Sequence, residues 1–159
     1  HGRWARSIER RRDGYDSAMS ALASSSRAVA GRGTTFARRV FLAAGSYGLV
    51  VLLPQYFLEA QIGRDYPPPI THPEHFYGFV GLAVVWQFAF LLIASDVVRF
   101  RPLMPIAVAE KAAFAIPTFI LFALGRVAGA TTAVAGIDAV LGLLFLAAWR
   151  GLRPEATSR

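Results

Sequence analysis

Four long apolar runs constrain what this chain can fold into more than any other feature of its sequence. They lie at about 40–58, 76–95, 103–125 and 132–149, between short segments that contain charges, prolines or glycines. A helix of about 20 apolar residues spans the ~30 Å hydrocarbon core of a bilayer, where backbone polar groups need partners within the chain. The runs therefore predict an all-α fold, a four-helix transmembrane bundle with a basic cytoplasmic N-terminal segment.

The distribution of arginine predicts how this bundle is oriented in a membrane. Nine of the 17 Lys and Arg residues fall within 1–39, and others lie in the second connection and in the C-terminal tail, 151–159. The first and third connections contain one arginine each, Arg64 and Arg126. Since the basic side of a membrane protein faces the cytoplasm, both termini are expected there. The excess of Arg, Ala and Gly indicates a bacterial protein, and hence the inner membrane.

The segment 1–39 is predicted to be a basic cytoplasmic arm, separate from the bundle at 40–150. Two interpretations stay open: short interfacial helices, or a tail that is ordered only by a partner or by lipid headgroups. Next to a transmembrane helix, anionic lipid is a better partner for this arm than nucleic acid. The candidate contacts with the membrane surface or a partner are Trp4, Arg6, Arg10, Arg11, Arg12, Arg38 and Arg39.

Four polar residues interrupt the apolar runs: Gln87, Glu110, Lys111 and Asp138. Counted along helices from the cytoplasmic edge, Lys111 lies roughly 8 Å deep, Gln87 roughly 12 Å and Asp138 roughly 18 Å. Ionisable groups inside a membrane commonly mark a functional site. The functional interpretation is a buried polar layer of these four residues that lines a pathway or a small ligand pocket.

From the sequence alone, a structural interpretation of the same residues is preferred. Neighbouring side chains on a helix point about 100° apart, so Glu110 and Lys111 need not pair with each other. Lys111 would then extend to the inner headgroups, and Glu110 would meet Arg99 or Arg101. Asp138 would pair across helices. The two interpretations differ in the partner of Glu110. Arg99 or Arg101 would indicate a structural role, and Gln87 would indicate a functional site.

The loop 59–74 contains four prolines and is predicted to be stiff and non-helical. At its end, His72, Glu74 and His75 could bind a metal ion. However, Pro73 and an acidic residue in the next position are typical of a helix start. The helix start is the preferred interpretation, and no metal ligand is predicted.

Several classes of active site are excluded or unsupported. The chain has no cysteine, which excludes disulfides, thiol catalysis and cysteine-bound metals. It also lacks a nucleotide-binding loop, a nucleophile elbow and a zinc signature. We therefore expect a protein that is not an enzyme, with no catalytic residue and no cofactor. The many aromatic residues leave contacts with bound lipid or pigment open.

Several motifs within 40–150 carry a resemblance to a known family. They are "LLPQYF", "ITHPEHFYGF", "WQFAFLLIASD", "RFRPLM" and "EK". With these motifs the chain resembles an uncharacterised family of small four-helix bacterial inner-membrane proteins that are distantly DoxX-like. The resemblance implies four helices and an inner-membrane location, and it implies no activity. The second run ends in "SDVV", where the family pattern has "RDP", so the following turn is expected to differ.

Three functions are compatible with these observations. The first is a non-catalytic accessory or scaffold subunit that packs against other integral membrane subunits of a larger complex, of respiratory or photosynthetic type. The alternative is a small oligomeric transporter or ligand-binding membrane protein that uses the buried polar layer. The weaker alternative, suggested by the DoxX-like resemblance, is a quinone- or redox-linked membrane protein.

Overall fold

The computed structural model describes residues 2–66 and 69–152, without the side chains of 2–18, 21–23 and 26–30. Every element within this part of the chain is helical. In order, these are α1 (Gly2–Leu52), the 3-10 helix η1 (Leu53–Phe57), α2 (Glu59–Asp65), α3 (Pro73–Ser95), the 3-10 helix η2 (Arg101–Leu103), α4 (Met104–Ala123) and α5 (Gly129–Gly151). The predicted all-α class is thereby confirmed.

Four of the helical segments are long and apolar enough to cross a membrane. They are Gly31–Phe57, Pro73–Ser95, Arg101–Ala123 and Gly129–Gly151. Each corresponds to one of the four predicted runs, and their boundaries differ from the predicted ones by at most a few residues, except at the start of the first. The chain is therefore a multi-pass membrane protein built as a four-helix bundle.

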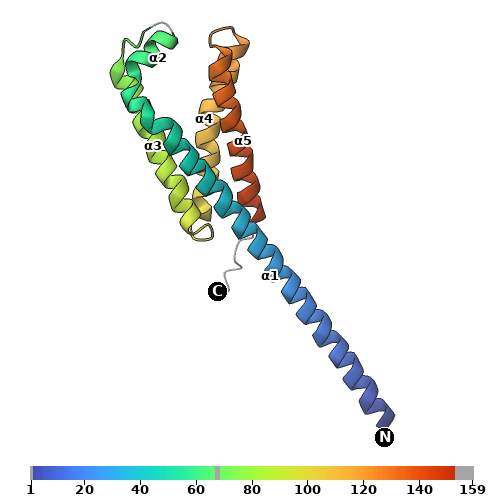
Figure 1. The fold of residues 1–159 in the computed structure, drawn as a ribbon. Coiled ribbons are helices and arrows are strands. Elements are labelled where there is room, and N and C mark those ends of the chain that lie inside the picture. The colour runs from blue at the N-terminus through green and yellow to red at the C-terminus, as the bar shows by residue number, and fades with distance from the viewer. Residues whose placement is uncertain (1, 67–68, 153–159) are drawn as a thin grey trace.

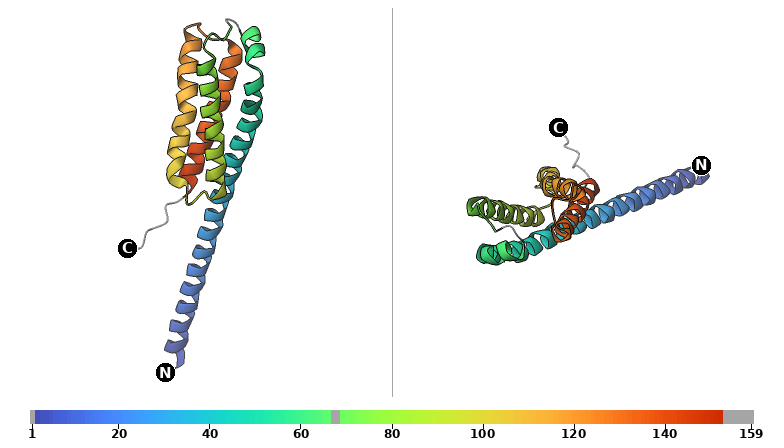
Figure 2. Two further views of the ribbon diagram at one scale, coloured as in Figure 1. Left: turned by 90° about the vertical axis from the view of Figure 1, so that its left-hand side faces the viewer. Right: turned by 90° about the horizontal axis from the view of Figure 1, so that it is seen from above.

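The first helix is longer than the sequence suggested. The backbone of α1 is helical without a break from Gly2 to Leu52, so the basic segment and the first span share one helix. Pro54 has no N–H to donate, and there the α-helix gives way to η1. The part of α1 that precedes the bundle projects alone from it (Figures 1 and 2).

The loop 59–74 also differs from its prediction, because its first half is the short helix α2. The prolines begin only at Pro67, so nothing prevents Glu59–Asp65 from forming backbone hydrogen bonds. The expectation of a non-helical loop was wrong for this half. The predicted helix start at Pro73 is confirmed, since α3 begins there with Pro73 in its first turn.

The long helices are arranged as two pairs. α1 packs along α3, α4 packs along α5, and α1 also contacts α5, which joins the pairs. The two pairs diverge towards the end of the bundle that carries α2 (Figure 1), while seen from the side they run nearly parallel (Figure 2, left). The space between the pairs thus widens towards this end.

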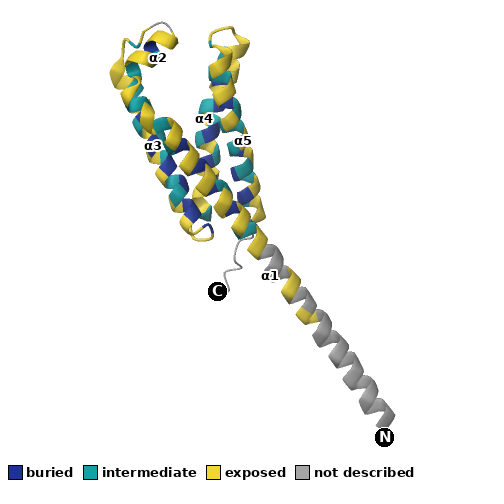
Figure 3. Cartoon of the chain, viewed as in Figure 1, coloured by how far each residue is buried: buried dark blue, intermediate teal, exposed yellow. Residues whose placement is uncertain are grey.

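The apolar core lies at the opposite end, where the pairs meet (Figure 3). Phe41, Phe90 and Phe145 are fully buried there and come from three different helices. The rings of Phe41 and Phe145 stack at a centroid distance of 4.2 Å, and Phe90 meets Phe145 edge to face at 4.9 Å. In a membrane such packing, rather than transfer out of water, holds helices together.

Gly45 sets how closely α1 approaches α3. A Cβ atom at this position would lie 2.9 Å from the backbone oxygen of Gln87 and 2.9 Å from the side chain of Leu91. Because a backbone oxygen cannot move aside alone, any larger residue here must push the two helices apart. Gly45 therefore acts as the small residue of a close interhelical contact.

We predict that Gly45→Val lowers the free energy of unfolding by about 1–2 kcal/mol, because it overpacks this contact. Reversible unfolding by SDS in mixed micelles, followed by circular dichroism, measures the change. Gly31→Val is the matched control in the same helix, since a Cβ at Gly31 would meet nothing within 4 Å. A loss for Gly45→Val no larger than that of the control would contradict the prediction.

Candidate functional site

A cavity of about 550 Å³ lies between the two helix pairs. Its wall comes from α1, α3, α4 and α5, with Ile62 of α2 and Tyr66 at the end that carries α2. Most of the wall is apolar, as with Tyr47, Phe79, Phe114 and Val134. Along α5 the wall extends from Ala130 to Leu141, about 16 Å at 1.5 Å per residue.

The four polar residues predicted from the sequence all line this cavity. Lys111 lies between two carboxylates: its Nζ is 3.3 Å from Oε2 of Glu110 and 3.1 Å from Oδ1 of Asp138. The lysine side chain is only 7% exposed, and each carboxylate side chain is 18% exposed. The structure therefore brings together an ion cluster of one cation and two anions, buried at the inner part of the cavity.

One oxygen of this cluster is held by an ion pair whose geometry is not that of a hydrogen bond. Oε2 of Glu110 is fully buried and lies within ion-pair distance of Lys111, yet it accepts no hydrogen bond from the described part of the chain. An ion pair stabilises a buried carboxylate oxygen less than a short charge-assisted hydrogen bond does. The three side chains are therefore in contact, but the pair of Glu110 and Lys111 is not in its strongest geometry.

The depth of Asp138 relative to Lys111 differs from the depth predicted by counting residues along the helices. Lys111 and Asp138 were expected at different depths, yet they are in contact. The backbone of α5 that faces Lys111 is at Gly142, where an added Cβ would lie 3.3 Å from the Cβ of Lys111. Asp138 is one helical turn away, and the long lysine side chain covers that turn. Lys111 therefore extends away from the basic end of the bundle instead of towards its headgroups.

An aromatic layer closes the inner end of the site. Nζ of Lys111 lies 5.2 Å from the ring centroid of Phe90, a distance at which an aromatic face attracts a cation. Phe90 is in turn packed against Phe41 and Phe145 of the core. The ammonium group thus has carboxylates beside it and an aromatic ring beneath it.

The fourth polar residue, Gln87, is buried next to α1 and makes a local hydrogen bond. Its Nε2 donates to the backbone oxygen of Ala83, one turn earlier in α3, at 2.9 Å. A Cβ at Gly48 would collide with the Gln87 side chain, so Gly48 provides the space in which it lies. Gln87 lines the same cavity but is not a partner of Glu110.

Arg101 is not the partner of Glu110 either. Its Nε donates to the backbone oxygen of Leu152 at 2.9 Å, and its guanidinium lies 5.1 Å from the ring centroid of Trp149. It thereby satisfies a carbonyl group at the C-terminal end of α5, which carries partial negative charge. None of the three expected partners, Arg99, Arg101 and Gln87, pairs with Glu110 among the described residues; its charged partner is its neighbour in sequence, Lys111.

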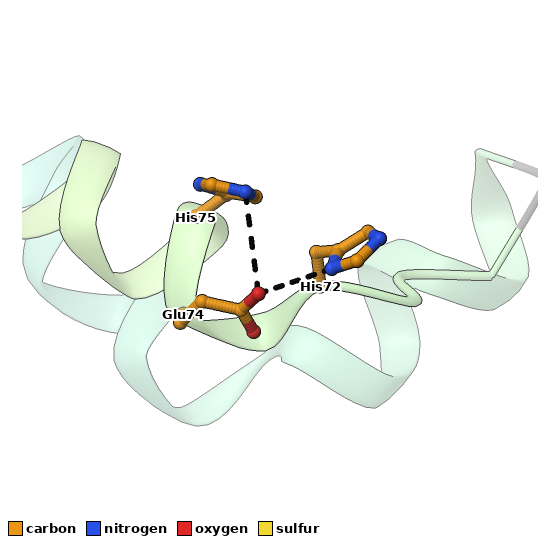
Figure 4. Close-up of side chains that lie close together, drawn as sticks. All are labelled: His72, Glu74 and His75. Atoms are coloured by element: carbon orange, nitrogen blue, oxygen red, sulfur yellow. Dashed lines mark hydrogen bonds and ion pairs between the residues drawn. The ribbon is translucent and has the colours of Figure 1, made fainter.

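The histidine cluster lies on the exposed start of α3, where both imidazoles approach one carboxylate (Figure 4). Nδ1 of His72 is 3.0 Å from Oε1 of Glu74, and Nε2 of His75 is 4.0 Å from it. One ligand atom from each of the three residues lies within 4.8 Å of the others. All three side chains are well exposed, and an exposed pair of this kind contributes little to stability.

The candidate surface contacts are placed only in part. Arg38 and Arg39 are exposed on α1, at the end of the bundle that is expected to be cytoplasmic. Trp4, Arg6, Arg10, Arg11 and Arg12 lie outside the residues whose side chains the structure describes. Their role at a membrane surface stays a prediction.

Several residues of the cavity wall were missed by the sequence reasoning. Tyr47, Tyr66, Phe114 and Thr131 lie on the same cavity but on four different segments. Aromatic residues are common throughout these spans, so their identity carries no signal of its own. Small residues such as Ala83 also line this cavity. They indicate open space only when the pairing of the helices is known.

Comparison with known proteins adds no further constraint. No family model, no curated protein and no solved structure matches this chain. The DoxX-like resemblance stays an expectation, and function must be inferred from the cavity and its ion cluster.

Proposed function

We propose that this protein is a ligand-binding membrane protein whose cavity holds a small, largely apolar molecule with its polar end at the ion cluster. The observation that carries the proposal is the ion cluster of Glu110, Lys111 and Asp138 on the wall of a cavity of about 550 Å³. Cavities that bind small molecules have volumes of about 300–1,000 Å³, are mostly apolar and contain a few convergent polar groups.

A purely structural ion cluster would have a different environment. Burying charged groups is costly, and the cost is offset only when every donor and acceptor has a partner. Here both carboxylate residues line the open volume, and Oε2 of Glu110 has an ion pair with Lys111 but no other partner among the described residues. A bound molecule with a hydrogen-bond donor would meet the exposed part of the carboxylates and fill the apolar volume at the same time.

The position of the cavity supports entry from the membrane or from the end that carries α2. The helix pairs diverge towards this end (Figure 1), and the wall there includes Ile62 and Tyr66. At the other end the aromatic core blocks passage. With one end blocked, this arrangement favours binding, and transport would require the helix pairs to move.

A substitution that fills the cavity tests the proposal. Ala83 lines the cavity on α3, and Ala83→Phe places a ring in the open volume. The neutral apolar probe 1-aminoanthracene, added to the protein in nanodiscs, should bind saturably and fluoresce more strongly. We expect Ala83→Phe to weaken this binding by about tenfold or more, which corresponds to ~1.4 kcal/mol of binding free energy.

Two controls separate the cavity from the lipid. Empty nanodiscs report the probe that dissolves in the bilayer, and Ala43→Phe adds the same ring at an exposed position of α1. Binding that is equal in the wild type, Ala83→Phe and Ala43→Phe would place the probe outside the cavity. Absence of saturable binding to the folded wild type would also refute the proposal.

A second candidate function is an accessory subunit of a larger membrane complex. The observation that favours it is the N-terminal part of α1, which projects from the bundle with no other described helix beside it (Figures 1 and 2). A lone helix of this kind gains stability when it packs against a partner. Purification in a mild detergent should then recover other integral membrane proteins in fixed ratio; a monodisperse monomer would contradict this role.

A further inference from the structure

We infer that the ligand of this cavity is an apolar molecule with a cationic N–H group, such as a protonated amine. The inference rests on the proposed function and adds the chemical class of the ligand. Its basis is the formal charge of the ion cluster, the position of its charges and the hydrogen-bond preference of its carboxylates.

The formal charge of the cavity wall is negative. With all groups ionised, Glu110 and Asp138 contribute two negative charges and Lys111 one positive charge, so the formal sum is −1. No other Lys, Arg, His, Asp or Glu belongs to the described lining of the cavity. Because a net charge in a medium of low dielectric is unfavourable, one further positive charge would neutralise the site.

The position of the charges leaves the negative groups facing the open volume. Lys111 is buried between the carboxylates and above Phe90, at 7% exposure, whereas both carboxylates keep 18%. The two carboxylate side chains are therefore more accessible than the lysine side chain between them. An anionic ligand would be repelled by this arrangement, and a cationic ligand would be attracted.

The two carboxylates favour a charged donor. Among the described residues they share one charged partner, the ammonium group of Lys111, at 3.3 and 3.1 Å. A charged N–H group forms shorter and stronger hydrogen bonds with carboxylates than a neutral donor does. The aromatic wall, which includes Tyr47, Phe79 and Phe114, suits an apolar body and is also compatible with a nearby cation.

Three probes with one shape and different charge test this inference. They are 4-phenylbutylamine, 4-phenylbutanol and 4-phenylbutyrate, which are cationic, neutral and anionic at pH 7. Their binding to the protein in zwitterionic nanodiscs is measured by equilibrium dialysis with mass spectrometry, against empty nanodiscs. We expect the amine to bind about tenfold more tightly than the alcohol, and the carboxylate to bind more weakly than both.

The matched variants are Glu110→Gln and Glu74→Gln. Both make the same chemical change, but Glu74 lies on the exposed start of α3 and does not line the cavity. Glu110→Gln should remove most of the preference for the amine over the alcohol, while Glu74→Gln should keep it. Circular dichroism of each variant checks its fold, and the three probes on the wild type decide the question even when a variant does not fold.

The outcomes distinguish this inference from the proposed function. Equal affinity of the wild type for all three probes, or a preference for the carboxylate, would refute the cationic ligand and leave a binding cavity. Absence of binding for all three would refute both proposals. A preference for the amine that survives in Glu110→Gln would also refute the inference, because the attraction would then come from elsewhere.

Discussion

Replacement of Lys111 by methionine is expected to lower the free energy of unfolding by about 3–5 kcal/mol, the usual cost of removing one partner from a buried ion pair. Lys111 is the only positive charge within reach of both Glu110 and Asp138, among the residues that the structure describes on the cavity wall. Without it, two carboxylates remain close together in a medium of low dielectric. SDS unfolding in mixed micelles measures the change.

The control for this prediction removes the whole cluster. In the triple variant Glu110→Gln, Lys111→Met, Asp138→Asn no charge is left unpaired, so its stability should return to within about 1 kcal/mol of the wild type or exceed it. This pattern would show that the cluster does not serve stability, which agrees with a role in binding. A single variant Lys111→Met that unfolds like the wild type would contradict the arrangement.

Replacement of Phe145 by alanine is expected to lower the free energy of unfolding by about 2–3 kcal/mol. The substitution vacates roughly 100 Å³ in the core, at about 24 cal/mol per Å³ of cavity. Phe145 is fully buried between Phe41 and Phe90, so no neighbour can refill the space without moving a helix. The same unfolding assay measures the loss.

The matched control is Phe88→Ala. Phe88 is 56% exposed on α3, at a position that faces lipid when the bundle is in a membrane. Lipid chains refill the space there, so we expect a change below about 0.5 kcal/mol. Similar losses for the two substitutions would mean that Phe145 does not join the helix pairs. Because this core also lies under Phe90 and Lys111, Phe145→Ala should additionally weaken ligand binding in the cavity.

The relation between the core and the cavity would let so small a bundle hold the proposed ligand. The pairs α1–α3 and α4–α5 meet in the aromatic layer at one end and diverge at the other (Figure 1). Packing at one end thus provides the rigidity, and divergence at the other end provides the volume. The ion cluster lies at the boundary between these two regions, where it is buried but still borders open space.

The number and course of the spans could be predicted from the sequence, because an apolar run of membrane length has few alternatives to a helix. The four polar residues could be selected for the same reason, since Gln87, Glu110, Lys111 and Asp138 stand out in apolar surroundings. The helix start at Pro73 was also predictable from local chemistry. Each of these inferences depends on residues close together in the chain.

Pairing between helices could not be predicted in this way. Whether Lys111 meets Asp138 depends on the level at which α4 and α5 pack, and Gly142 sets that level through a contact between distant residues. The length of α1 was missed because a basic, serine-rich segment can be helical or irregular by composition alone. The sequence by itself determined the helices and the charges within the membrane. Only the tertiary structure decided that these charges form one cluster on a cavity, because contact between helices depends on packing distances that no local pattern specifies.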